Sequence, residues 1–372
     1  MGLDLGAHGL KATVIRREGR ANILVKALSL PIAGGIDWAN TSASAPVLRQ
    51  LRGILAANGL RNTDACFALP PNGIVQRWVD LEGLPPAERS DAARHRLRKF
   101  IPDNKQVYVA VSEDTDPITN EHLVTVLPRA VVDQYAEAVL ALGLNPLTAE
   151  PESNALLRVA GSVLRRRSPL LRDGAAILID VGMNRTRVDI VRDERVEFTR
   201  EFRFGASGFL ERIVQELVLS PAEAEAALQG AGTKLSPRGW LQVPTSGVLA
   251  QIDVNEPINV LLHESSRLIR YFRSIYPERS YSGTVSTALI TGGMAALDGM
   301  VDFIERSLSI ETSTIDPLSV VRVDLPEDEF VMLARSPFSF STATGLALSI
   351  RNLNRNQQEV PRDRTGIRTR AA

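Results

Sequence analysis

Two stretches of the chain share one pattern of apolar and polar positions. The stretches GLDLGAHGLKATVIRREGR and ILIDVGMNRTRVDIVRDERV each read as an apolar strand with an Asp, a Gly, a polar turn, an alternating strand and a charged turn. The two copies are 176 positions apart, measured from Asp4 to Asp180. Period-two alternation predicts the strand pairs 11–15 with 23–28, and 186–191 with 196–202. We therefore expect two structurally related lobes.

The segment between the copies has a different pattern. Alternating positions predict strands at 74–79, 107–112 and 123–127. Helical spacing predicts helices at 87–100, after a Pro-Pro start signal, and at 131–142, which ends at a Gly. This β-α-β-β-α order predicts a compact inserted subdomain.

The residues after the second copy read mostly as helices. A helical stripe at 209–217 and a helix capped by Ser220 are followed by the amphipathic stretch INVLLHESSRLIRYFRSIY. A last strand-turn-helix reads ALITGGMAALDGMVDFIERSL. GAGTKLS, around Lys234, lacks P-loop spacing and is interpreted as a helix-terminating loop. The tail from about Arg351 has almost no apolar residues and is predicted to be disordered.

Composition limits the class of protein. The chain has 372 residues, too many for one core, with 44% hydrophobic residues, 23% charged residues and zero formal net charge. A folded soluble protein is expected, and a nucleic-acid partner is not. The single Cys66 lies in an apolar run, which predicts a buried structural thiol and a reducing compartment. No apolar run approaches the roughly 18 residues that span a bilayer, so we expect a cytoplasmic protein that reaches membranes through partners.

The repeated turn predicts phosphate chemistry. A Gly after a strand permits a tight turn whose N–H groups can bind an anion. One such turn from each lobe could hold a triphosphate, with Lys11 neutralising further charge. Asp4 and Asp180 would repel each other in a shared site, so Mg²⁺ is expected between them and the phosphates. Gly292 and Gly293 would let the backbone pass close beneath a base.

The ordered set of motifs resembles the actin-like ATPase superfamily. GLDLGAHGLK and LIDVGMNRTRVDIV look like its two phosphate motifs, and LITGGMAALDGM looks like its adenosine motif. AEPESNALLRVAG and SFSTATGLALS look like its two connecting helices. The resemblance implies an α/β actin-like ATPase fold, with two related lobes around a nucleotide cleft and a β-α-β-β-α subdomain inserted in the first lobe.

Within this superfamily the chain is most similar to the PilM family of type IV pilus assembly, because RHRLRKFIPDNKQVYVAVS and HLVTVLPRAVVDQYAEAVLALGLNP resemble the PilM insert. The resemblance implies a cytoplasmic scaffold, peripheral to the inner membrane, whose inserted subdomain and adjoining lobe bind the N-terminal peptide of a PilN-type protein. Other pilus inner-membrane components and self-association are further implied partners. It also implies the following organisation: first lobe 1–65, inserted subdomain 66–148, connecting helix 149–171, second lobe 172–336, return helix 337–352 and disordered tail 353–372.

The resemblance also implies roles for individual residues. Asp4 and Asp180 would hold Mg²⁺ through water. ATP or ADP would be contacted by Gly6, Lys11, Gly182, Thr186, Glu225, Gly292 and Gly293. Glu150 would orient or deprotonate the attacking water, and the alternative for this residue is a carboxylate that favours a helix N-terminus.

Two departures from the superfamily pattern leave open whether ATP is bound tightly or hydrolysed. The resemblance implies at most a weak ATPase activity. The first turn reads Ala7-His8-Gly9 where hydroxyl residues are common, and Leu228 stands where a Lys is expected after Glu225. An FtsA-like division protein and a metabolite kinase are the alternatives. The polar tail offers no amphipathic membrane helix of the FtsA kind, which favours the PilM reading.

Overall fold

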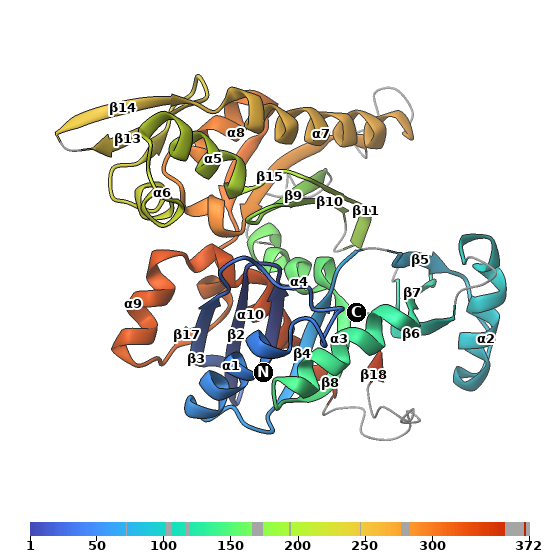
Figure 1. The fold of residues 1–372 in the computed structure, drawn as a ribbon. Helices are drawn as coiled ribbons and strands as arrows, with labels where there is room; N and C mark the ends of the chain where they lie inside the picture. The colour runs from blue at the N-terminus through green and yellow to red at the C-terminus, as the bar shows by residue number, and fades with distance from the viewer. Residues whose placement is uncertain are drawn as a thin grey trace. The chain divides into compact units, whose positions relative to one another are not determined.

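The computed structural model describes residues 1–71, 73–101, 106–116, 119–165, 174–192, 195–245, 247–276, 283–353 and 368–369. The chain divides into two compact units (Figure 1). The first comprises Met1–Arg17, Leu24–Ala155 and Thr342–Ala372, and the second comprises Glu18–Ile23 and Leu156–Ser341. The predicted second lobe, 172–336, falls within the second unit. The predicted tail lies outside the described residues, apart from the end of one helix and two residues of a strand.

The first unit is built on a sheet whose middle strands come from the first repeat. The sheet has the order β17-β3-β2-β1-β4-β8-β18. Strand β1 pairs antiparallel with β2 and parallel with β4, and β4 pairs parallel with β8. The strands of the first unit are β1 (Gly2–Gly6), β2 (Gly9–Glu18), β3 (Ala21–Pro31), β4 (Asp64–Leu69), β8 (Asn145–Pro151) and β18 (Arg368–Thr369), while the edge strand β17 (Arg322–Val323) belongs to the chain segment of the second unit.

Helices pack on both faces of this sheet. On one face, α1 (Ala45–Ala57) and α3 (Arg129–Ala141) bury apolar residues against Phe67 of β4. On the other face, α10 (Ser341–Leu353) packs so closely on β1 that a Cβ at Gly2 would collide with the carbonyl oxygen of Ala343. Alternate residues of β4 serve the two faces, as the pleat of a strand requires.

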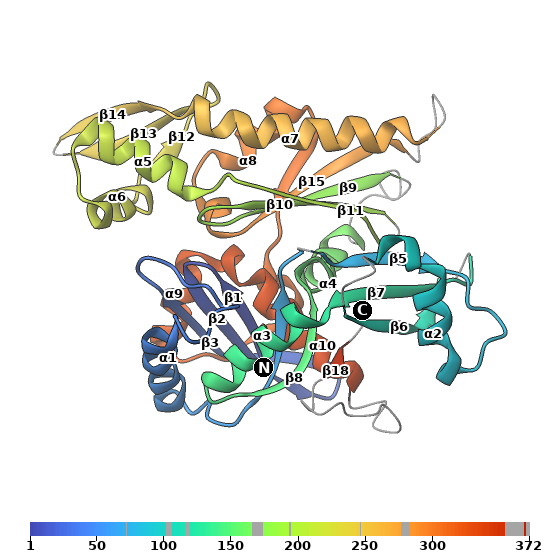
Figure 2. The ribbon, with the colours of Figure 1, turned by 45° about the vertical axis from the view of Figure 1, so that its right-hand side comes forward.

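A separate three-stranded sheet forms the insert, at the right of Figure 2. Its order is β5-β7-β6, with β5 (Val75–Val79), β6 (Val107–Thr115) and β7 (His122–Pro128). Helix α2 (Pro86–Arg96) and a 3-10 turn, η1 (Arg98–Phe100), share its apolar core. The predicted strand and helix order is confirmed. Because β4 and β8 belong to the large sheet and α3 packs in its core, the separate sheet spans 75–128, less than the predicted 66–148.

The second unit repeats the strand arrangement of the first. Its five-stranded sheet has the order β11-β10-β9-β15-β16, which corresponds strand by strand to β3-β2-β1-β4-β8. In both sheets a hairpin is followed by two parallel neighbours. The predicted duplication is therefore confirmed. The strands are β9 (Ala175–Val181), β10 (Thr186–Arg192), β11 (Arg195–Phe202), β15 (Val285–Thr291) and β16 (Glu311–Thr314).

Helices and a small sheet complete the second unit. The predicted buried stripe of α7 is confirmed, with Leu261, Leu268 and Phe272 in the core. The small sheet has the order β12-β13-β14. These elements are α4 (Glu152–Arg165, which begins in the first unit), α5 (Ala206–Leu217), α6 (Pro221–Leu228), β12 (Lys234–Leu235), β13 (Trp240–Thr245), β14 (Val248–Asp253), α7 (Asn255–Ser274), α8 (Met300–Leu308) and α9 (Glu327–Arg335).

Candidate functional site

The first repeat forms a β1–β2 hairpin with a two-residue turn. Gly6 pairs with Gly9, and Asp4 pairs with Lys11 directly across the hairpin. Residues opposite each other in an antiparallel pair have their Cβ atoms about 4.5–5.5 Å apart, so Asp4 and Lys11 are neighbours across the hairpin. Both side chains are partly exposed. The first unit thus presents an acid and a cation next to a tight turn.

The carbonyl oxygens of this turn all face one neighbouring loop. The three donors are Trp38 Nε1 to Gly6 at 2.9 Å, the Ile36 amide to Ala7 at 2.8 Å and the Ile32 amide to His8 at 2.9 Å. In a planar trans peptide the N–H points opposite to the C=O. The amides of Ala7 and His8 therefore point away from this loop, in the orientation that an anion-binding turn requires.

The second repeat forms the same hairpin in the same register. The Gly182 amide donates to the carbonyl oxygen of Arg185 at 3.0 Å, and Asp180 pairs with Arg187 across the β9–β10 hairpin. In each repeat a cation follows the Asp by seven positions and stands opposite it. Arg187 is not among the predicted site residues, although this shared spacing is the signal that could have identified it.

Arg187 is buried between two carboxylates. Its Nη2 is 3.4 Å from Asp180 Oδ2 and its Nε is 3.2 Å from Asp189 Oδ2. The side chains of Arg187 and Asp189 are 3% and 1% exposed, whereas that of Asp180 is 24% exposed. Of these three side chains, only that of Asp180 reaches the protein surface. The buried Arg187 guanidinium holds the Asp180 carboxylate in position from the interior.

Two glycines follow strand β15 in the second unit. Gly292 has a φ of +87°, and a Cβ there would collide with the carbonyl oxygen of Val181 and lie 2.6 Å from Asp180 Oδ1. Gly293 is exposed, and a Cβ there would meet nothing within 4 Å. The backbone at Gly292 thus packs on the Asp180 turn, while Gly293 leaves an open surface beside it that a flat ligand could cover.

The second turn does not fit a magnesium ion bound directly to Asp180. Oδ2 of this carboxylate faces the Arg187 guanidinium and Oδ1 lies against Gly292. Within the described residues, no group of three or more His, Cys, Asp or Glu side chains could hold a metal ion. The Arg187 guanidinium also offsets the negative charge of Asp180, which weakens the repulsion expected between the two carboxylates. A water-mediated ion at Asp4 and Asp180 stays a prediction.

The surroundings of Thr186 and Glu225 decide whether each predicted residue can contact a ligand. Thr186 is fully buried and donates to the carbonyl oxygen of Phe204 at 3.0 Å, so a phosphate has no access to its hydroxyl. Glu225 lies on the exposed side of α6 and accepts a hydrogen bond from Gln229 at 3.3 Å. Thr186 therefore supports the turn, and Glu225 stays a candidate for ligand contact.

Glu150 lies on strand β8 and is fully buried. The alternative in which this carboxylate favours a helix N-terminus stays a prediction, since Glu150 precedes the first residue of α4, Glu152, by two positions. Full burial also gives Glu150 no contact with bulk water in this conformation. Its predicted role toward an attacking water is not tested by the geometry.

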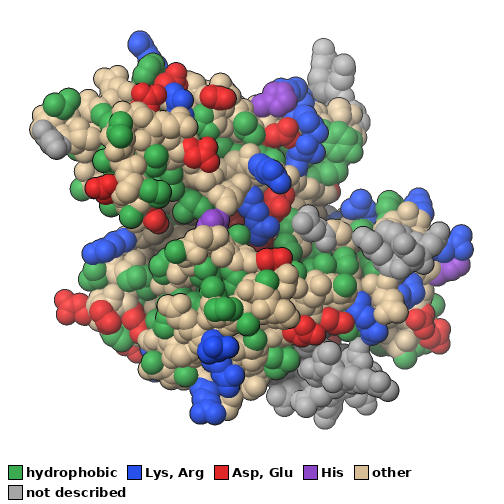
Figure 3. Space-filling view, in the orientation of Figure 1, with side chains coloured by type: hydrophobic (Ala, Val, Ile, Leu, Met, Phe, Trp, Pro, Cys, Tyr) green, Lys and Arg blue, Asp and Glu red, His purple; other side chains and the backbone are tan. Residues whose placement is uncertain are grey.

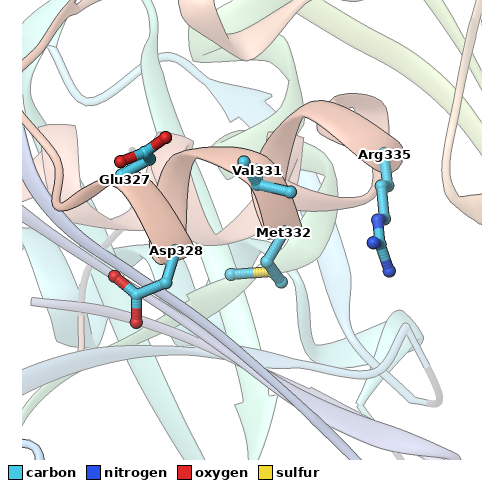
Figure 4. A pocket seen from close by; sticks show the side chains of 5 residues that line it. All are labelled: Glu327, Asp328, Val331, Met332 and Arg335. Atoms are coloured by element: carbon cyan, nitrogen blue, oxygen red, sulfur yellow. The ribbon is translucent and has the colours of Figure 1, made fainter.

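A surface hollow lies over α9, away from the predicted residues. It is lined by Glu327, Asp328, Val331, Met332 and Arg335, which Figure 4 shows along the exposed side of the helix. None of these residues belongs to a repeated turn or to the Gly292–Gly293 segment. We therefore assign the candidate site to the turns and not to this hollow.

Comparison with known proteins identifies a family and a fold. A family model described as type IV pilus assembly protein PilM matches residues 2–351. No curated protein matches the chain by sequence. A solved structure described as the PilM-PilN type IV pilus biogenesis complex is 19% identical, with a TM-score of 0.69, and covers 94% of this chain and 97% of that chain. The predicted α/β actin-like ATPase fold is confirmed.

Two more distant structures match at lower similarity. The ethanolamine utilization protein EutJ from Carboxydothermus hydrogenoformans is 15% identical with a TM-score of 0.48, and covers 93% of this chain and 88% of that chain. MreB5 of Spiroplasma citri bound to ADP is 13% identical with a TM-score of 0.48, and covers 96% of this chain and 98% of that chain.

Among the described helices, none combines the length and the apolar character that a bilayer crossing needs.

Proposed function

Because the chain belongs to the PilM family of type IV pilus assembly proteins, we propose that it is a cytoplasmic scaffold that binds the N-terminal peptide of a PilN-type inner-membrane protein. The family match carries this proposal, since residues 2–351 include both repeated units and the insert. The matched PilM-PilN complex supports it further. Other pilus components and a second copy of the chain are additional proposed partners.

Peptide titration tests this function. The full chain is titrated with a synthetic peptide of the cytoplasmic N-terminus of a PilN-type protein from the same genome, by isothermal titration calorimetry. We expect saturable one-to-one binding in the micromolar range or tighter, and no binding of a scrambled peptide of equal composition. Equal heats for both peptides, or none at high micromolar concentration, would contradict the proposal.

A second part of the proposal is that the chain binds ATP or ADP. Each unit has a hairpin turn of the kind whose backbone N–H groups bind phosphate oxygens. Lys11, partly exposed beside Asp4, would neutralise phosphate charge, and Gly182 would contribute through its backbone. Gly292 and Gly293 would lie beneath the base, because no side chain there blocks a flat group. Glu225 and Glu150 are assigned to the ribose and to water, respectively.

Magnesium has a restricted role in this proposal. When bound, it would supply positive charge to the phosphates through water ligands at Asp4 and Asp180. In the second unit, however, Arg187 already faces Asp180 at 3.4 Å, so the carboxylate gains less from an added cation. We therefore propose that nucleotide binding tolerates removal of magnesium better than a site of two unpaired carboxylates would.

Nucleotide binding is tested separately from peptide binding. A fluorescent ATP analogue is titrated into the full chain with magnesium and with EDTA. We expect saturable binding that unlabelled ATP displaces, with a Kd that EDTA raises by less than about tenfold, which corresponds to roughly 1.4 kcal/mol. A variant with Lys11→Ala should bind more weakly, whereas Lys26→Ala, on neighbouring strand β3, is the matched control. Binding that ATP does not displace would contradict a nucleotide site.

The two alternatives are weaker for this chain. A metabolite kinase and an FtsA-like division protein would use the same fold, and the family match to PilM favours neither. Turnover of ATP stimulated by a sugar or acid metabolite would be the result that revives the kinase alternative.

A further inference from the structure

The insert carries positive charge that the fold does not explain. Between Arg94 and Lys99 the chain reads RHRLRK, without an acidic residue, in a protein of zero formal net charge. All four Lys and Arg side chains of this stretch, Arg94, Arg96, Arg98 and Lys99, are exposed. Exposed Arg77, on neighbouring strand β5, adds a further cation. Figure 3 shows Lys and Arg side chains gathered on the insert, at the right of the view.

We call the residues Arg77, Arg96, Arg98, Lys99 and Phe100 the basic face. Among the described residues, its four cations make no ion pair with a carboxylate. Two arginines also bind backbone carbonyl oxygens: Arg77 Nη1 donates to Gln76 at 2.8 Å, and Nη2 of Arg94, which is left out of the set, donates to Val107 at 3.2 Å. The helix dipole accounts for cations in the last turn of α2, but Arg98 and Lys99 follow the helix and Arg77 lies on a strand.

Phe100 lies exposed among these charges. Its side chain is 41% exposed, while the neighbouring Leu97 is buried in the core of the insert. Arg77 Cζ and Lys99 Nζ each lie 5.3 Å from the centroid of the Phe100 ring. These cation–π contacts cover the ring face, which disfavours a nucleic-acid partner because a base needs a free face for stacking. An apolar ring surrounded by Lys and Arg is instead typical of a membrane interface.

We propose that the basic face binds the surface of a bilayer that contains anionic lipids. Arg96, Arg98, Lys99 and Arg77 bind lipid phosphates, and Phe100 lies at the level of the headgroups. This contact gives the chain a membrane contact of its own, in addition to the proposed peptide. A few surface cations and one aromatic ring give weak, salt-sensitive binding, so the contact adds to a protein anchor and does not replace it.

Vesicle flotation with the full chain tests the proposal. The vesicles are phosphatidylcholine alone, or phosphatidylcholine with about 30% phosphatidylglycerol, at about 0.05 M and 0.5 M salt. We expect binding to the anionic vesicles only, and loss of that binding at the higher salt. The variant Arg96→Glu/Arg98→Glu/Lys99→Glu should reduce the partition coefficient at low salt by about tenfold or more.

Matched variants separate the basic face from general charge. Arg270→Glu/Arg273→Glu/Arg306→Glu makes the same change at exposed arginines of α7 and α8 and should leave vesicle binding within about twofold. Phe100→Ala should weaken binding severalfold, and Phe100→Trp should preserve it, because Trp also favours the interface. Circular dichroism and the PilN-type peptide titration check that each variant is folded.

Three results would overturn the proposal. The first is that the chain does not bind anionic vesicles at low salt, or binds neutral and anionic vesicles equally. Equal loss in the two triple variants assigns any binding to net charge and not to the basic face. Saturable binding of a poly-glutamate peptide that the basic-face variant abolishes, without vesicle binding, assigns the face to an acidic protein segment. The wild-type chain is titrated with the PilN-type peptide in parallel, so failure of vesicle binding with peptide binding retained leaves the proposed function intact.

Discussion

Arg187 faces Asp180 across the β9–β10 hairpin, with Nη2 3.4 Å from Oδ2, in the same register in which Lys11 faces Asp4 across β1 and β2. The duplicated unit thus keeps an acid and a cation opposite each other in both copies. The copies differ in burial, because Arg187 is 3% exposed and also binds Asp189, whereas Lys11 is partly exposed. Arg187 therefore fixes its carboxylate, and Lys11 is the cation able to meet a ligand.

Removing the buried guanidinium should destabilise the second unit. In Arg187→Ala, the buried Asp189 carboxylate would lose its 3.2 Å contact with the guanidinium, and the expected loss is about 3–5 kcal/mol in the free energy of unfolding. Urea unfolding followed by circular dichroism measures it. The matched control is Arg185→Ala, which removes a 34% exposed partner of Glu201 and should cost less than about 1 kcal/mol.

The pair of variants Arg187→Ala and Asp189→Ala shows whether the loss comes from this ion pair. Because the double variant leaves no unpaired buried charge at these two positions, it should be more stable than Arg187→Ala alone. Additive losses in the double variant would mean that the two side chains do not interact, contrary to the 3.2 Å contact.

The two adjacent glycines should respond differently to substitution. Gly292→Ala places a Cβ against Val181 and Asp180 at a positive φ, so we expect a loss of several kcal/mol in stability and weakened nucleotide binding. In Gly293→Ala the added Cβ meets no atom within 4 Å, so the free energy of unfolding should stay within about 1 kcal/mol of the wild-type value. If the nucleotide covers Gly293 as proposed, this stable variant still binds it more weakly. Thermal unfolding and titration of the fluorescent ATP analogue separate the two effects.

Much of the fold could be predicted from the sequence because the two repeats use local signals. Alternating strands, a Gly after each first strand and polar turns predicted both hairpins, and the strand orders confirm that the lobes are related. The limits of the insert could not be read in this way. Strand β4, with Cys66 and Phe67, is as apolar as an inserted strand, and only its pairing with β1 and β8 assigns it to the large sheet.

The candidate site was less accessible to sequence reasoning, because burial and side-chain direction depend on tertiary packing. Thr186 follows the second turn as a phosphate ligand would, but its hydroxyl points to Phe204 inside the unit. Arg187 lies in an alternating strand, and a single cation in such a strand usually faces solvent, so the local pattern does not predict its burial. The packing of α4 over the sheet face that carries Ala176, Leu178 and Val191 makes that face buried, and no local pattern predicts it.

The indole of Trp38 should hold the first turn in its anion-binding orientation. Trp38 is 3% exposed and donates from Nε1 to the Gly6 carbonyl oxygen at 2.9 Å. Trp38→Phe removes this donor and leaves a small cavity, so we expect a loss of about 1–3 kcal/mol in stability and a severalfold rise in the Kd for nucleotide. Trp240→Phe, at a 38% exposed position, is the control and should change neither quantity appreciably. An unchanged Kd in folded Trp38→Phe would contradict a role for this turn.

The buried thiol of Cys66 should make stability depend on pH in the alkaline range. Burial raises the pKa of the Cys66 thiol, and the neighbouring Glu150 carboxylate raises it further, while a hydrogen bond with Ser349 opposes the shift. An unfolded chain loses this proton near the ordinary thiol pKa of about 8.5, whereas the folded chain retains it. The unfolded state then binds fewer protons, so stability falls as pH rises above about 8.5, by at most about 1.4 kcal/mol per pH unit. Below that pH the thiol is protonated in both states and contributes no pH dependence.

Comparison with Cys66→Ala isolates this effect from other titrating groups. Urea midpoints of both proteins are measured at about pH 7.5 and pH 10, and the difference at pH 7.5 reports the packing lost with the sulfur atom. Between the two pH values the wild type should lose more stability than Cys66→Ala, so the difference in the free energy of unfolding between the two proteins should be smaller at the higher pH. A difference that stays constant would mean that Cys66 has the same pKa in the folded and unfolded chains, and that its surroundings are wetter than its full burial implies.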